Sequence, residues 1–133
     1  MDTPLTNPKP AAFLLWLARR RNHRGLKLVC LLLGGDIGAQ DYEGLILPHP
    51  YGITIHAASP VGPRCVIYQN VTIGTKHGYA QPPVVGADVV IGANAVIIGP
   101  IVIGDGAIIG AGAVVIADVP AHSVVVGNPA RVV

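Results

Sequence analysis

A six-residue period of branched apolar residues runs through most of this chain and limits the folds that it can adopt. The residues that share the spacing are Ile55, Val61, Ile67 and Ile73, and then Val85, Ile91, Ile97, Ile103, Ile109 and Val115. A period of six fits a three-sided solenoid, in which each side is one short strand and each branched side chain points into a narrow lumen. We therefore predict a parallel β-helix from about Ile55 to Val126.

A second set of positions supports the same fold. Four places after each branched residue stands a small or branched one, as the limited room in a lumen requires; these are Ser59, Cys65, Val71, Val89, Ala95, Ile101, Ala107, Ala113 and Val119. Glycine often follows the branched residue directly. Glycine, asparagine and aspartate tolerate the backbone of tight turns, which suits Asn94 and Asp105.

One stretch interrupts the period. Thr75–Val84 reads TKHGYAQPPV, which is polar, aromatic and rich in proline between two regular blocks. We expect it to be a loop that projects from the solenoid, and loops on rigid scaffolds often carry function.

The composition is unusually poor in charge, with 12% charged and 51% apolar residues. An ordinary domain has roughly twice that share of charge, so we expect part of the surface to be buried against other copies. Cys30 and Cys65 have no metal or redox spacing, which favours reduced thiols in a cytosolic protein.

The first 35 residues form a region of their own, and we place the domain boundary between residues 1–35 and 36–133. Ala11–Leu33 is predicted to be helical, with Gly25 dividing it into two helices and Gly34-Gly35 ending it. Residues 1–35 contain six basic residues and one acidic residue, so their net charge is 6 − 1 = +5.

We favour a role for this region as a cap that packs on the repeats or on a neighbouring subunit. The alternative is a helix that lies on a membrane surface. Neither a signal peptide nor a membrane-spanning segment is expected here.

The repeats and three phrases resemble the hexapeptide-repeat acyltransferases. The phrases are GLILPHPYGITIH (44–56), VIYQNVTIG (66–74) and GNPARVV (127–133). They are similar to those of serine acetyltransferases and of short relatives that acetylate capsular or exopolysaccharide sugars. The resemblance covers residues 35–133 and implies an all-β fold with a left-handed β-helix. It also implies a homotrimer with active sites between subunits, acetyl-CoA as donor and a hydroxyl as acceptor.

An alcohol that attacks a thioester needs a base, and histidine titrates near neutrality. His49 matches the family's catalytic histidine, and Asp36 resembles the aspartate that orients its imidazole. The spacing between them is two residues shorter than in serine acetyltransferases, so Asp41 and Glu43 are alternatives. His77 in the loop is a further catalytic candidate, because related galactoside and maltose acetyltransferases carry their histidine in such a loop.

Acetyl-CoA is expected in the groove between two solenoids, where small residues let its pantetheine arm approach the backbone. By motif match, Ala93, Ala111 and Ala117 line that groove, with ordinary repeat turns as the alternative reading. Arg131 and Lys76 are candidate contacts for the CoA phosphates. No metal or nucleic-acid partner is expected.

Two departures from the serine acetyltransferase pattern leave the acceptor open. Pro48 stands where those enzymes have an aspartate before the catalytic histidine, and Pro82 stands where they have a histidine that ends the loop. The leading hypothesis is acetyl transfer to L-serine or a similar small acceptor, and a sugar or exopolysaccharide hydroxyl is the alternative. A non-catalytic or zinc-binding β-helix is a remote third. We expect a cytoplasmic location, which includes the inner face of the membrane.

Overall fold

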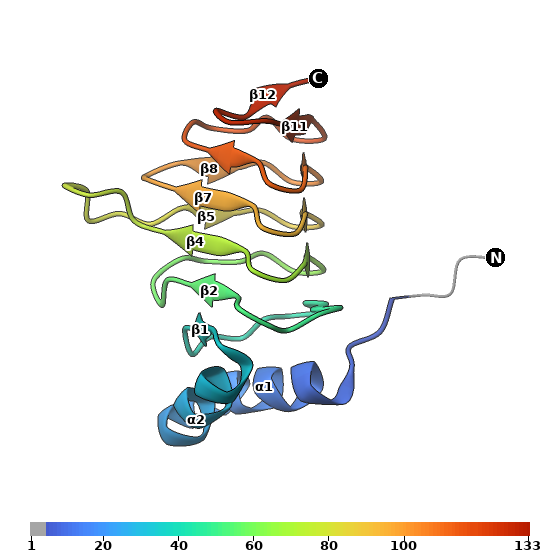
Figure 1. Cartoon of the computed structure of the whole chain (residues 1–133), viewed down its shortest axis with the longest axis vertical. Coiled ribbons are helices and arrows are strands. Elements are labelled where there is room, and N and C mark those ends of the chain that lie inside the picture. Colours follow the sequence, from blue (N-terminus) through green and yellow to red (C-terminus); the bar gives the residue numbers. More distant parts are fainter. Residues whose placement is uncertain (1–4) are drawn as a thin grey trace.

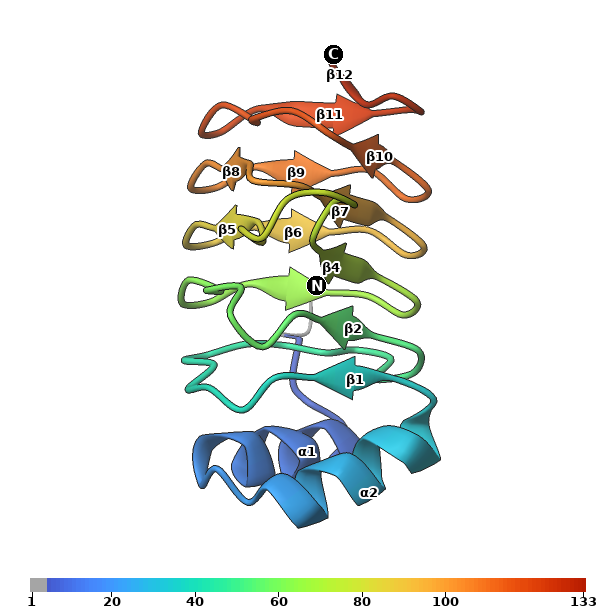
Figure 2. The same ribbon diagram turned by 90° about the vertical axis from the view of Figure 1, so that its left-hand side faces the viewer.

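The computed structural model describes residues 5–133, so the part of the first region that precedes Leu5 lies outside it. It is a parallel β-solenoid closed at one end by two helices (Figures 1 and 2). The predicted solenoid is thereby confirmed. The C-terminus lies at the end opposite the helices (Figure 1).

The helical cap consists of α1 (Lys9–Arg19) and α2 (His23–Leu33). The expected break at Gly25 is wrong, because Gly25 lies within the first turn of α2. The chain turns earlier, where Asn22 caps α2 by accepting a hydrogen bond from the Gly25 N–H at 3.1 Å. Gly34 ends α2 in the left-handed conformation (φ 69°), as the sequence predicts.

Twelve strands among the described residues form three sheets, one on each side of the solenoid. Sheet 1 has the order β1-β2-β4-β7-β10, sheet 2 has β12-β11-β9-β6-β3, and sheet 3 pairs β5 with β8. All pairs are parallel except β11 with β12. The bounds are β1 Asp36–Ile37, β2 Thr54–Ile55, β3 Val66–Ile67, β4 Thr72–Gly74, β5 Val84–Val85, β6 Val90–Ile91, β7 Val96–Ile98, β8 Val102–Ile103, β9 Ile108–Ile109, β10 Val114–Val115, β11 Val124–Val126 and β12 Arg131–Val132.

The lumen is filled as the period predicts. In sheet 1 the stacked residues are Ile37, Ile55, Ile73, Ile97 and Val115, and all are at most 3% exposed. The small residues four places after each branched one are buried as well, including the polar Ser59, whose hydroxyl donates to the Pro83 carbonyl. Each buried Ile or Val side chain contributes about 1.5–3 kcal/mol.

Two insertions depart from the regular coil, and both lie at corners between sheets. Ile55 and Ile73 are paired and 18 residues apart, whereas the paired Ile73 and Ile97 are 24 apart. The six extra residues belong to the segment between β4 and β5, residues 75–83, which projects from the solenoid (Figure 1). Because an insertion at a corner leaves the strands on both sides in register, the lumen continues unchanged through it.

Candidate functional site

His49 lies on the second insertion, a bulge at the corner where the chain passes from sheet 2 to sheet 1. Ile46 bridges to Val66, and Thr54 pairs with Thr72. In the first coil the chain advances eight residues around this corner, from 46 to 54. In the next coil it advances only six, from 66 to 72. The two extra residues fall within the phrase PHPYG, and His49 is exposed there.

Asp36 lies on the outer surface of sheet 1. It pairs with Thr54, and its N–H donates to the Ile53 carbonyl at 2.9 Å. Its side chain is exposed while that of Ile37 is buried, so the carboxylate points away from the lumen. Within residues 5–133 no hydrogen bond joins Asp36 to His49. Asp36 is level with Thr54 in sheet 1, and it lines a hollow that reaches Thr75.

The corner that carries His49 continues along the solenoid as a column of equivalent residues. Gln69, Ala93 and Ala111 follow one another in it, because the Asn94 N–H donates to the Gln69 carbonyl and the Gly112 N–H donates to the Ala93 carbonyl. We call this column, with residues 48–52, the His49 edge. The GNPAR turn lies at its far end, where the Ala130 N–H donates to the Val114 carbonyl, and this places the exposed Arg131 nearby.

Sequence reasoning missed Gln69. Its Oε1 is buried, and it has no hydrogen-bond partner among the described residues. The available signal is its repeat slot: Gln69 stands two places after Ile67, where the equivalent residues are alanines. A long polar side chain in a slot otherwise kept small, next to the His49 bulge, is a candidate for contact with a substrate.

The other predicted residues lie at the opposite corner, where the chain leaves sheet 1 for sheet 3. We call residues 75–83, with Gly99 and Ala117, the loop edge. His77 is exposed on the loop, and the Lys76 ammonium lies 5.5 Å from the centre of the Tyr79 ring. The Tyr79 N–H donates to the Lys76 carbonyl at 2.9 Å, which closes the turn around His77.

One side of the solenoid therefore separates the candidates into two groups. His49, Ala93, Ala111 and Arg131 lie at or near the His49 edge, while His77, Lys76 and Ala117 lie at the loop edge. Asp36 lies on the side between them, level with Thr54 and Thr72. That side is six residues long, from Gln69 to Thr75, or roughly 20 Å at a strand's rise per residue. A single chain does not bring the two groups together.

Sheet 1 itself carries a hollow of about 460 Å³ between the two edges, lined by Asp36, Thr54, His56, Thr75 and their neighbours. His56 accepts a hydrogen bond from the Ala58 N–H through Nδ1 at 3.1 Å. This bond occupies Nδ1, so His56 is a turn cap whose outward nitrogen is Nε2.

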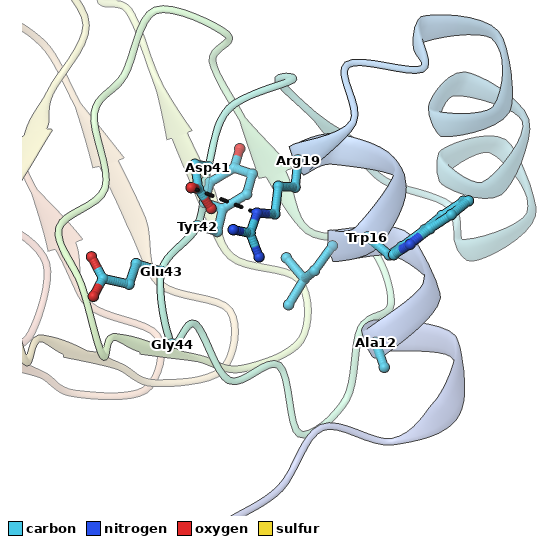
Figure 3. A pocket seen from close by; sticks show the side chains of 8 residues that line it. Ala12, Trp16, Arg19, Asp41, Tyr42, Glu43 and Gly44 are labelled. Carbon is cyan, nitrogen blue, oxygen red and sulfur yellow. Dashed lines mark ion pairs between the residues drawn. The ribbon is translucent and has the colours of Figure 1, made fainter.

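A larger hollow of about 500 Å³ lies elsewhere, between α1 and the first coil, and His49 does not line it (Figure 3). Arg19 reaches across it to Asp41, with Nε 3.8 Å from Oδ2. Asp41 is therefore engaged with the cap, and Glu43 lines the same hollow (Figure 3). Of the two alternatives to Asp36 as the partner of His49, Asp41 faces the cap and Glu43 points away from α1 (Figure 3).

The cysteines have no visible part in this site. Cys30 and Cys65 are free and buried, and burial raises the pKa of both thiols, which disfavours the reactive thiolate. Across residues 5–133 no three His, Cys, Asp or Glu side chains are grouped as metal ligands.

Comparison with known proteins agrees with the fold and the phrases. The family model described as bacterial transferase hexapeptide (six repeats) matches residues 82–117. A serine acetyltransferase of Synechococcus elongatus is 42% identical over 107 residues, which is 77% of this chain and 44% of that protein.

Solved structures of serine acetyltransferases also superpose on this chain. The serine acetyltransferase of Neisseria gonorrhoeae superposes with a TM-score of 0.74 at 37% identity, over 90% of this chain and 48% of that one. Soybean serine acetyltransferase complexed with serine gives 0.70 at 34% identity, over 93% of this chain and 54% of that one. The match to the hexapeptide model and the three stacked sheets together define a hexapeptide-repeat β-solenoid. Within that class the chain is similar to serine acetyltransferases, and it spans about half the length of the relatives it matches.

Proposed function

We propose that this protein is an acetyl-CoA-dependent O-acetyltransferase that acetylates a hydroxyl of L-serine or a similar small acceptor. The observation that carries the proposal is the His49 bulge, because the regular ladder is broken there and an imidazole is exposed. The relatives named above support the reaction class, and one of them is described in complex with serine.

In this mechanism His49 removes the proton of the acceptor hydroxyl as its oxygen attacks the thioester carbonyl. A carbon–oxygen bond forms, the carbon–sulfur bond breaks, and the imidazolium returns the proton to the departing CoA thiolate. In this proposal the Asp36 carboxylate orients the imidazole and stabilises its cationic form.

The donor would lie along the His49 edge. Ala111 and Gly112 are exposed there and carry little side-chain bulk, so an extended chain could approach the backbone closely. Arg131 at the far end of that edge is placed to meet phosphate groups. Residues of the loop edge, His77, Lys76 and Ala117, would reach the same site from a neighbouring copy, which fits an active site formed between subunits of a trimer.

A sugar hydroxyl is the second candidate acceptor. Pro48 and Pro82 favour it, because each replaces a side chain that the resemblance assigns to the amino-acid substrate. Pro82 also directly precedes the buried Pro83, whose carbonyl accepts from Ser59, so the loop end is held in place without a histidine.

The test is release of CoA thiol from acetyl-CoA in the presence of L-serine, of its analogues and of a panel of sugars and oligosaccharides. Serine-dependent release with O-acetylserine as product supports the first acceptor, and sugar-dependent release supports the second. Absence of acceptor-dependent release by a folded protein that binds CoA in calorimetry would argue for a non-catalytic β-helix.

A further inference from the structure

The outer side of α2 is apolar although nothing in the described chain packs on it. Leu28, Leu31 and Leu32 are 59%, 76% and 75% exposed, whereas Leu26 and Cys30 on the inner side are at most 4% exposed. The spacing of three and four residues places the three leucines along one stripe. An exposed apolar stripe on a helix whose other side is already buried marks a surface for a partner.

The chemistry around the stripe indicates what that partner is. Arg24 and Lys27 are exposed on the same helix, Arg19 ends α1, and Arg20 and Arg21 follow it. Residues 5–35 hold six basic residues and no acidic one. Amphipathic helices that combine leucines with lysine and arginine bind to anionic membrane surfaces.

Two aromatic residues of α1 are also exposed, and one of them, Trp16, borders the hollow between α1 and the first coil. Phe13 and Trp16 are stacked, with ring centres 5.9 Å apart, and both are about half exposed. The Arg20 guanidinium lies 4.6 Å from the centre of the Trp16 ring. Tryptophan beside arginine is typical of side chains at the level of lipid headgroups.

The position of the cap makes docking possible without any change of fold. Both helices lie across one end of the solenoid, away from the remaining coils (Figures 1 and 2). No helix in residues 5–133 has the length and apolar character needed to cross a bilayer. We propose that the cap docks on a bilayer surface that carries anionic phospholipids, with Leu28, Leu31 and Leu32 between the headgroups and the basic side chains against the phosphates.

A second copy of the chain fits this surface less well. Two caps brought face to face would bring the arginines and lysines of both copies together, and their mutual repulsion disfavours this contact. A bilayer with anionic lipid supplies the opposite charge and the apolar interior at once.

The experiment is flotation of the full chain with vesicles of equimolar phosphatidylcholine and phosphatidylglycerol, and with vesicles of phosphatidylcholine alone. We expect binding to the first and far weaker binding to the second, with binding reduced by added salt. Leu31→Ser combined with Leu32→Ser should lower the partition coefficient by at least about ten-fold. Arg24→Gln combined with Lys27→Gln should lower it by about five-fold for each charge removed.

The matched control is Val133→Ser, which makes a similar apolar-to-polar change at a residue 77% exposed and far from the cap. It should bind vesicles as the parent chain does. Circular dichroism checks that each variant stays folded, as expected for side chains already in solvent. Equal binding by the leucine variant, or no binding by the parent chain, overturns the proposal. A change in the oligomeric mass of the leucine variant without lipid would assign the stripe to a protein contact instead, and this also overturns it.

Discussion

His49 is exposed because two extra residues lift its segment out of the ladder at one corner of the solenoid. Replacing it with alanine removes the proposed general base, and we expect acetyl transfer to fall by about 10²–10⁴-fold. The bulge lies outside the lumen, so the melting temperature should stay nearly unchanged. Thiol release and thermal unfolding measured on the same preparation give both results.

His56→Ala is the matched control, since it removes an exposed imidazole from the same coil. His56 caps a turn through its Nδ1, so this change should lower stability by about 1 kcal/mol and turnover much less than the loss of His49. Comparable losses of turnover in the two variants would contradict the assignment of the base to His49.

Tyr42 makes stability depend on pH in the alkaline range. Its hydroxyl donates to the Gly38 carbonyl at 2.8 Å and accepts from Gln40 at 3.2 Å, and burial raises its pKa from 10.0 to about 12. The unfolded chain loses this proton near pH 10, while the folded chain keeps it until about pH 12. The stabilisation by the neutral phenol is therefore complete below pH 10 and is lost as pH rises to about 12, an effect of about 2–3 kcal/mol.

Tyr42→Phe isolates this contribution. The variant lacks the hydrogen bonds, so it should be less stable than the parent near neutral pH by about 1 kcal/mol. Because it lacks the ionising group, the difference should shrink and then reverse between pH 10 and about 12. Denaturant unfolding across that range measures it, and a constant difference would show that Tyr42 ionises normally in the folded chain.

At the scale of elements, the projecting loop is separable from the scaffold. Deleting Lys76–Gln81 leaves Thr75-Pro82-Pro83 at the corner, which matches Gly99-Pro100-Ile101 one coil later. Thr75→Gly belongs in the same variant, because Gly99 adopts φ 105° there. We expect unfolding free energy to change by less than about 1 kcal/mol and acetyl transfer to fall to background.

His77→Ala distinguishes the imidazole from the rest of the loop. A loss as large as that of the deletion assigns the role to His77, and a small loss assigns it to Lys76 or to the loop backbone. Full turnover by the deleted chain would show that the loop edge is not part of the site.

The regular elements could be predicted from the sequence because a period of six fixes which side chains enter the lumen. Even Ser59 and Cys65 are buried where that period places them. The bulge could not be predicted, since residues before Ile55 show no clear period and only the pairing of Ile46 with Val66 reveals the extra residues. The helix break was misplaced because the capping bond of Asn22 outweighs the flexibility of Gly25.

At the scale of the whole molecule, the candidate site is divided between two edges of one chain. The sequence could name His49 and His77 as candidates, but one chain cannot show how the corners of two copies meet. Exposed branched residues on the outer sides, such as Val102 and Ile116, supply apolar surface for such contacts.

Complementation tests this arrangement. Neither the His49→Ala chain nor the loop-deleted chain should be active alone. If each site takes His49 from one copy and the loop from the next, random trimers of the two co-expressed chains should recover about a quarter of the parent activity. Light scattering should give a mass of about three times 13.7 kDa. Co-expressed chains that form mixed trimers without activity would show that one chain supplies both edges.

The placement of the six-residue insertion has a consequence for how such a protein diversifies. Strand pairing runs on both sides of the corner without a slip, with Ile73 still paired to Ile97 across the gap. A loop of another length or composition can therefore replace this one without changing the side-chain packing in the lumen. In the proposed enzyme, such an exchange would alter the acceptor preference and leave the folding of the solenoid unchanged.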